Sequence, residues 1–227
     1  MTAMLNVTRL HNAITAAALM RRGVMLASAY ASQREAFGRT LDRHPLQQRV
    51  LQEMTAQADG ALYLTMRMAQ LLGRIEGEEA TADEVALFRL GIALVKLYTG
   101  KQAVAVLSEA IECFGGQGYM EDTGLPRLLR DAQVLPIWEG TTNVLSLDAL
   151  RVVRKPETLE ALNAEFERLD APAREAVIGE AKQLASSDSA ERNARQVAYA
   201  LALAWMRGLL RQAGVELIPE AVAQARP

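Results

Sequence analysis

The sequence predicts an all-α protein, an up-and-down four-helix bundle with a C-terminal helical extension. Three observations predict this fold. Aromatic residues make up only 5% of the chain, while Ala, Leu, Arg, Glu and Gln, which favour helix over sheet, are plentiful. Apolar residues recur at helical spacing over long stretches, and no segment has a convincing strand pattern. With half of its 227 residues apolar, the chain can bury a large core.

Two long helices are expected at the start of the chain. The first covers about residues 7–36, where apolar residues return every three or four positions, and Gly38 stops it. The second covers about residues 45–72. It begins at Pro45, because the N–H that proline lacks would have no partner in the first turn of a helix.

The third helix is expected over residues 82–113 and opens with a capping box. The Thr81 hydroxyl and the Glu84 carboxylate can satisfy the free N–H groups of its first turn. A helix of about 30 residues is long for a globular domain and favours a bundle. The glycine-rich run 115–118 ends it as a cap and turn. A fourth helix is expected over residues 140–153.

A domain boundary is predicted at Pro156, between the bundle (residues 1–155) and a helical appendage (residues 156–227). The composition changes after this proline. Further helices are expected over residues 158–169, 172–185 and 188–212. The run Ser186-Ser187-Asp188 is expected to cap the last one.

Charge and cysteine content limit the possible functions. The net charge is −2, from 25 basic and 27 acidic residues, so no excess of positive charge attracts nucleic acid or anionic lipid. Cys113 is the only cysteine, which excludes an intrachain disulfide and a Cys-based zinc cluster. His11 and His44 are the only histidines, and neither has Glu three residues earlier, as a di-iron bundle would need.

Neither a membrane span nor an export signal is expected from the sequence. No apolar run approaches the length of about 20 residues that a span needs. The first residues lack the basic and apolar regions of a signal peptide. We therefore expect a cytoplasmic protein.

The most informative carboxylate is Glu139. It follows Trp138 and precedes Gly140 and two hydroxyl residues that can open a helix. A carboxylate against an aromatic ring is poorly solvated, so its proton affinity should rise, which suits a general base. The alternative is an ordinary glutamate near a helix start, where the helix dipole favours negative charge. From these residues alone, the alternative is the simpler interpretation.

Two other sites are candidates for ligand contacts. Arg34, followed by Phe37 and the flexible Gly38, could hold a phosphate and stack a purine. The alternative is a helix-end arginine beside a buried phenylalanine. Gly115 and Gly116 could let the backbone approach a bound group, or could simply end a helix.

A further group of charges follows the glycine-rich run. Arg127, Arg130 and Asp131 suggest ion pairs around a short turn. Surface pairs of this kind are common and contribute little to stability.

Four ordered motifs resemble the C-terminal helical domain of the acyl-CoA dehydrogenases. Each motif alone is unspecific, but their order and spacing together are specific. The motifs are residues 33–39 (QREAFGR), 111–119 (IECFGGQGY), 129–132 (LRDA) and 137–141 (IWEGT). The resemblance covers about residues 6–154. Trp138 in place of the usual tyrosine, together with the helical tail, resembles the alkylation-response branch of the family.

The resemblance implies a fragment of a longer FAD-dependent enzyme, because two further domains precede this bundle in the family. Glu139 would remove the α-proton of an acyl-CoA thioester, and its backbone N–H would help polarise the thioester carbonyl. The β-hydrogen would leave as hydride to FAD, giving a 2,3-enoyl-CoA, and an electron-transfer acceptor would then reoxidise the flavin. Thr8, Arg9 and Gly140 would contact the substrate. The isolated chain is expected to be inactive.

The resemblance also implies where FAD would bind. The expected contacts are Arg34, Phe37, Gly115, Gly116, Thr141 and Asn143. In the family the first four reach the cofactor of a neighbouring subunit, in a homodimer or homotetramer. Two alternatives stay open: a nucleic-acid-associated alkylation-response flavoprotein domain, and a helical oligomerisation module. The first is disfavoured because the chain from Glu157 onward has 11 acidic and 8 basic side chains.

Overall fold

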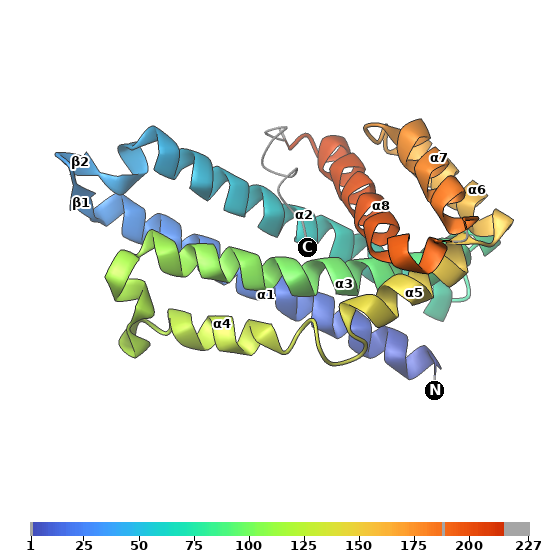
Figure 1. The fold of residues 1–227 in the computed structure, drawn as a ribbon, viewed down its shortest axis with the longest axis horizontal. Helices are drawn as coiled ribbons and strands as arrows, with labels where there is room; N and C mark the ends of the chain where they lie inside the picture. The colour runs from blue at the N-terminus through green and yellow to red at the C-terminus, as the bar shows by residue number, and fades with distance from the viewer. Residues whose placement is uncertain (1, 188, 216–227) are drawn as a thin grey trace.

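The computed structural model describes residues 2–187 and 189–215, and this part of the chain is almost entirely helical (Figure 1). The predicted all-α class is confirmed. The α-helices are α1 (Thr2–Gln33), α2 (Pro45–Glu76), α3 (Ala82–Cys113), α4 (Leu125–Gln133), α5 (Thr142–Val153), α6 (Pro156–Arg168), α7 (Arg174–Ala185) and α8 (Ala190–Gln212). The shorter elements are β1 (Glu35–Ala36), β2 (Arg39–Thr40) and the 3-10 turns η1 (Leu41–Arg43), η2 (Gly115–Tyr119) and η3 (Glu121–Thr123).

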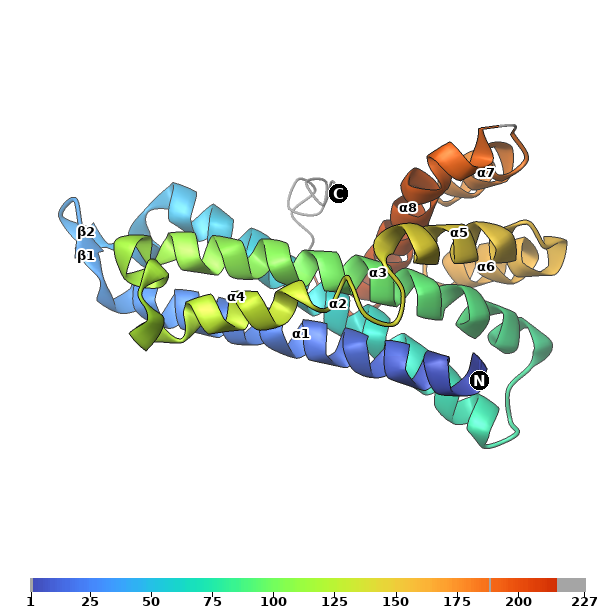
Figure 2. The same ribbon diagram turned by 60° about the horizontal axis from the view of Figure 1, so that its bottom comes forward.

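The bundle has four columns that alternate in direction (Figures 1 and 2). α1, α2 and α3 each form one column and pack against one another. The fourth column is α4 followed by α5, and both pack against α3. The predicted four-helix bundle is therefore present, but its last column is broken by a non-helical segment, residues 134–141.

The sequence analysis missed α4, where it expected a short turn. Arg127 and Asp131 do pair, at 3.7 Å, but one turn apart on a helix. This helix begins after Gly124, which has a φ of +72°, and has a proline in its first turn. A glycine closely followed by a proline is a helix-start signal, and the sequence contained it at Gly124 and Pro126.

The prediction that the chain contains no strands was wrong at one place. α1 ends at Gln33, three residues earlier than predicted, because β1 and β2 form an antiparallel hairpin. Its two-residue turn is Phe37-Gly38, with φ of +52° and +82°. Positive φ at both positions suits the twist of a tight hairpin, and for phenylalanine this conformation is unusual.

The predicted caps have mixed outcomes. The capping box is confirmed, since the Glu84 N–H donates to Thr81 Oγ1 at 3.2 Å and the Thr81 N–H donates to Glu84 Oε2 at 2.9 Å. The predicted cap of the last helix is wrong for Ser186, whose hydroxyl donates to the Lys182 carbonyl, and α8 begins after Ser189 without a side-chain cap. Asp188 lies outside the described residues.

Helices α6, α7 and α8 form the appendage, and α8 joins it to the bundle. α8 packs on α2, α3, α5 and α7. One apolar cluster runs from Leu10 of α1 to Leu210 of α8, so the core continues across Pro156. The buried Glu165 of α6 accepts hydrogen bonds from Arg67 of α2, at 2.8 and 3.1 Å, and from Trp205 of α8, at 3.3 Å. The domain division at Pro156 stays a prediction.

The central helix is α3. Its length and hydropathy alone would let it cross a membrane, but 83% of its most apolar window is buried inside the protein. Burial of this kind is expected for the middle helix of a bundle, which is apolar on all sides.

Candidate functional site

The segment 134–141, between α4 and α5, carries the candidate base. Glu139 is half-buried and has a φ of +59°, and Gly140 follows with a φ of +108°. A Cβ at Gly140 would lie 3.2 Å from Leu145, so this position requires glycine for its conformation and for its space. A non-glycine residue in the left-handed region costs about 1 kcal/mol or more, and such residues cluster at functional sites. The same backbone explains why α5 begins at Thr142 instead of the predicted residue 140.

The start of this segment is held close to α1 and α3. Asn12 of α1 is fully buried, and its Nδ2 donates to the Leu135 carbonyl at 3.1 Å. On the α3 side, a Cβ at Gly100 would lie 3.2 Å from the Leu135 carbonyl and 3.3 Å from the nitrogen of Pro136. The small residue at this position lets the segment lie directly on α3.

Two cations hold the end of the segment. Arg9 of α1 donates through Nε to the main-chain oxygen of Glu139 at 3.3 Å. Lys96 of α3 donates through Nζ to the main-chain oxygen of Gly140 at 2.5 Å. The carbonyls of Glu139 and Gly140, on either side of the Gly140 Cα, are therefore fixed by side chains from the bundle.

Arg9 is itself held by a buried carboxylate on α5. Its NH1 lies 3.1 Å from Asp148 Oδ2, and Arg89 of α3 binds the other oxygen of Asp148 at 2.7 Å. Burial would raise the pKa of Asp148, but the hydrogen bonds and charges of Arg89 and Arg9 outweigh it and hold the pKa below its ordinary value. Asp148 therefore stays ionised and fixes the Arg9 side chain.

Lys96 has an unusual environment for an ammonium group, because it is fully buried. Burial lowers the pKa of Lys96 from 10.5 to about 8, the Arg9 charge lowers it too, and the Glu139 carboxylate partly opposes them. The pair of cations behind Glu139 thus includes one whose pKa, at about 8, lies well below that of an exposed lysine.

The other predicted substrate and cofactor residues of this region adjoin the loop. The Thr8 hydroxyl donates to the carbonyls of Met4 and Leu5, at 3.2 and 3.1 Å, within its own helix. Thr141 precedes α5 and makes no side-chain capping bond, and both it and Asn143 are exposed. Trp138 is 48% exposed. The exposed side of the loop is therefore apolar and hydroxyl-bearing, with charge behind it.

The remaining predicted FAD residues lie at the other end of the bundle. Arg34 and Phe37 belong to the hairpin end of α1, and Gly115 and Gly116 to the end of α3 (Figure 1). The stacked rings of Tyr30 and Phe114, 4.1 Å between centroids, join these two helix ends.

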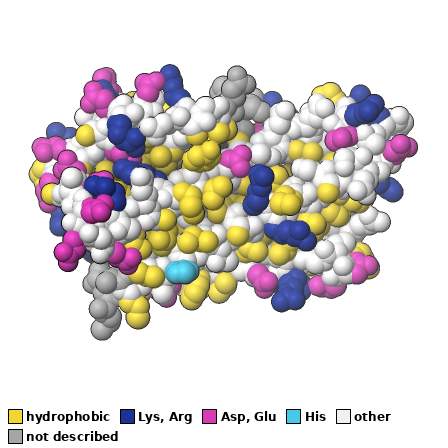
Figure 3. Space-filling view, turned by 180° about the vertical axis from the view of Figure 1, so that it is seen from behind, with side chains coloured by type: hydrophobic (Ala, Val, Ile, Leu, Met, Phe, Trp, Pro, Cys, Tyr) yellow, Lys and Arg dark blue, Asp and Glu magenta, His cyan; other side chains and the backbone are white. Residues whose placement is uncertain are grey.

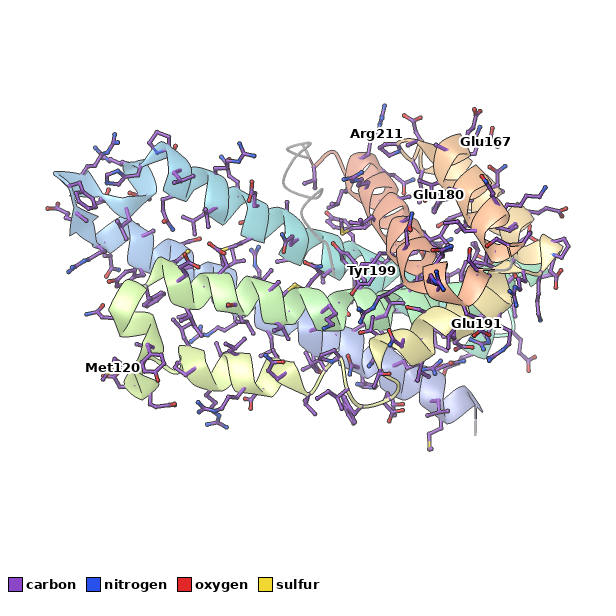
Figure 4. The ribbon with its side chains drawn as sticks, viewed as in Figure 1. Met120, Glu167, Glu180, Glu191, Tyr199 and Arg211 are labelled. Atoms are coloured by element: carbon purple, nitrogen blue, oxygen red, sulfur yellow. The ribbon has the colours of Figure 1, made fainter. Side chains whose placement is uncertain are left out.

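The distance between the two ends excludes one site within one chain. Arg9 lies near the start of α1 and Arg34 just past its end, about 38 Å apart at 1.5 Å per residue. Met120, just past the glycine turn, marks the far end in Figure 4, opposite the appendage that carries Glu167 and Arg211. Phe37 is 96% exposed, so the alternative of a buried phenylalanine is wrong.

Sequence reasoning missed Lys96, Asn12 and Asp148. A signal was present for Lys96, which interrupts a run of apolar residues from Leu90 to Leu97. A lysine inside such a run is rarely buried without a specific reason. No local pattern marked Asn12 or Asp148, because their partners are more than 100 residues away or on another helix.

Comparisons with known proteins give the family context. A family model described as "Acyl-CoA dehydrogenase, C-terminal domain" matches residues 1–153. The Caenorhabditis elegans protein "Acyl-CoA dehydrogenase family member 11" is 53% identical over 156 residues, which are 69% of this chain and 25% of that protein. "Putative acyl-CoA dehydrogenase AidB" of Escherichia coli (strain K12) is 39% identical over 148 residues, 65% of this chain and 27% of that protein. The chain thus spans about a quarter of the length of these two relatives.

A solved structure extends the likeness to the appendage. The crystal structure of Caenorhabditis elegans ACDH-11 in complex with C11-CoA has a TM-score of 0.84 and 41% sequence identity to this chain. The likeness covers 99% of this chain and 42% of that one.

Proposed function

This chain belongs to the acyl-CoA dehydrogenase family, and we propose that it is the C-terminal domain of a longer FAD-dependent enzyme that forms a 2,3-enoyl-CoA from an acyl-CoA. The observation that carries this proposal is the Glu139 carboxylate on a left-handed loop held by the buried Lys96 and the partly buried Arg9. The complex of a 41% identical protein with C11-CoA supports an acyl-CoA thioester as the substrate class. Alone, the chain is inactive in this proposal, because it supplies only one side of the site.

Glu139 is the base in this proposal. It takes the α-proton of the thioester, which is weakly acidic and must be polarised at the same time. The N–H of Glu139 donates to the thioester carbonyl, and Arg9 keeps that part of the backbone in place. Thr8, Arg9 and Gly140 lie beside the bound substrate. Arg34, Phe37, Gly115, Gly116, Thr141 and Asn143 would hold FAD, which would supply the hydride acceptor for the β-hydrogen and the route of the electrons to an electron-transfer acceptor.

The exposed predicted residues fit a flavin nucleotide shared by two copies of the chain. At the hairpin end, Phe37 presents a bare aromatic face, and the Arg34 guanidinium makes no ion pair with any residue that the structure describes. Space is open around Gly115 and Gly116, where an added Cβ would touch nothing. Because these groups lie at the opposite end of the bundle from Glu139, about 38 Å away along α1 in the case of Arg34, they serve the site of a neighbour.

An apolar face supports assembly into a homodimer or homotetramer. Figure 3 shows hydrophobic side chains gathered over the middle of the face seen from behind. A groove of about 500 Å³ between α1 and α2 is lined by Ile14, Leu62, Tyr63 and Met66, all partly exposed. Exposed apolar patches on helical faces are typical of protein–protein interfaces.

Nucleic-acid binding is the second candidate, and α8 gives it little support. Arg211 is bound to Asp170 at 2.7 Å, and Arg195 and Arg207 are half-buried. Among the described residues of α8, Arg192 is the one exposed arginine that forms no ion pair. DNA binding that weakens steeply with salt would favour this candidate.

The test uses the full-length protein with acyl-CoA and an electron acceptor. Glu139→Gln is expected to abolish turnover while FAD stays bound, because the amide cannot take the proton. Glu175→Gln, an exposed residue of α7, is the control and is expected to keep full turnover. Normal turnover in Glu139→Gln would remove Glu139 as the base and the proposal with it.

A further inference from the structure

Lys96 carries a charge that the packing of the bundle does not need. Its side chain is fully buried in the middle of α3, between Val95 and Leu97, both of which are buried too. It forms no ion pair with any carboxylate in the described residues, and its recorded partner is the Gly140 carbonyl. An unpaired buried ammonium destabilises the folded state, and a methionine of similar shape would avoid this cost.

The charged groups that face Lys96 come from two other elements. Arg9 reaches it from α1, and Glu139 from the loop. Arg9 is paired with Asp148, a carboxylate that it shares with Arg89 and Arg151, whereas Lys96 is paired with no carboxylate among the described residues. Among the described residues, the Glu139 carboxylate is the only negative group that acts on Lys96.

The hydrogen bond from Lys96 acts on the backbone conformation that aims the Glu139 side chain. Glu139 has a positive φ, which costs free energy for a residue with a Cβ and needs support from outside the loop. Arg9 donates to the Glu139 carbonyl, and Lys96 donates to the Gly140 carbonyl. Without Lys96, the Gly140 carbonyl would lose its side-chain partner, and only the Glu139 carbonyl would be held.

We propose that Lys96 is a positioning residue for Glu139: it anchors the Gly140 carbonyl and places a positive charge behind the carboxylate. The role as an aid to catalysis rests on the proposed function, but the anchoring and the charge coupling do not. They belong to the chain itself and can be measured without substrate or cofactor.

The first experiment uses the 227-residue chain and NMR. In wild type, the Lys96 side-chain signal is expected to titrate near pH 8. Glu139→Gln is expected to lower this midpoint, since it removes the charge that supports the ammonium. Lys96→Met is expected to speed amide hydrogen exchange at residues 139–141, while Lys101→Met, a half-buried lysine of the same helix, leaves it unchanged. An unshifted Lys96 midpoint together with unchanged exchange in Lys96→Met would overturn the inference.

The second experiment separates this inference from the proposed function. In the full-length protein, Lys96→Met is expected to lower kcat about 10- to 100-fold with little change in KM, because the base is misplaced and binding groups are kept. Lys96→Arg, which keeps a charged donor, is expected to recover part of this loss. If Glu139→Gln is inactive but Lys96→Met has wild-type kcat, the positioning role is wrong and the proposed function stands. If Glu139→Gln is active, the proposed function fails, while the NMR result still decides whether Lys96 anchors the loop.

Discussion

Arg9 and Glu139 are joined across 130 residues of sequence by one hydrogen bond, from the guanidinium Nε to the main-chain oxygen, at 3.3 Å. The bond connects the first helix of the bundle to the break in its last column. It leaves the Glu139 carboxylate free while fixing the backbone that carries it. The position of Glu139 thus depends on how α1 packs in the bundle as well as on its own segment.

Removing Arg9 should loosen the loop. Arg9→Gln deletes the bond to Glu139 and one of the three ion pairs of Asp148, so the free energy of unfolding is expected to fall by about 1–3 kcal/mol. Amide hydrogen exchange at residues 139–141 should speed up by more than this global loss explains. Arg22→Gln, an exposed change on the same helix, is the control. Because the Arg9 charge lowers the pKa of Lys96, that pKa should rise in Arg9→Gln.

The pKa of Lys96 should make stability depend on alkaline pH. Its folded value of about 8 lies below the ordinary 10.5, so between these values the unfolded chain holds a proton that the folded chain has released. Rising pH therefore favours the folded state over this window. The free energy of unfolding of wild type, relative to Lys96→Met, should rise by up to about 3 kcal/mol between about pH 8 and 10.5. Urea unfolding of both proteins across this range checks it, and parallel curves would contradict it.

Adding one methyl group at Gly140 should destabilise the folded state around Glu139. The φ of +108° disfavours alanine, and its Cβ would crowd Leu145 at 3.2 Å. We expect Gly140→Ala to destabilise the protein by about 1–3 kcal/mol, measured by thermal unfolding. Gly179→Ala is the contrasting variant and should have the opposite effect on stability, because Gly179 lies within α7 with open space around it. That change should stabilise the protein by about 0.5–1 kcal/mol.

The attachment of the appendage should depend on Arg67. This residue of α2 binds the buried Glu165 of α6 through two hydrogen bonds. Arg67→Met leaves Glu165 with Arg168 and Trp205 only, and we expect a loss of about 3 kcal/mol. Limited proteolysis should then cut within α6–α8 before the bundle. Arg43→Met, a change at an exposed residue, is the control. Equal protease resistance of wild type, Arg67→Met and Arg43→Met would show that Arg67 is not needed to attach the appendage.

The sequence predicted those parts of the fold that depend on local patterns. The long helices and the Thr81–Glu84 capping box follow from apolar spacing and helix-start chemistry, and both are found in the structure. The hairpin at Phe37-Gly38 was missed because two-residue strands contain no alternation to detect. Helix α4 was missed because its nine residues are few for a periodic signal.

The candidate site was predicted unevenly for a similar reason. Glu139 and Gly140 were found because a motif carries them on adjacent positions. The groups behind them were not, because Lys96 and Asp148 acquire their roles only when α3 and α5 pack together. Burial of a charge and the identity of its partner are properties of tertiary contact, which a single sequence does not display.

Under the proposed function, the opposite placement of Arg34 and Glu139 on one bundle has a genetic consequence. In an assembly where each cofactor touches two copies, damage at the two ends falls on different sites once subunits mix. A copy lacking Arg34 and a copy lacking Glu139 would each form dead homodimers, yet their hybrid would contain one intact site and one doubly damaged site. Two recessive lesions in this one gene would then complement each other.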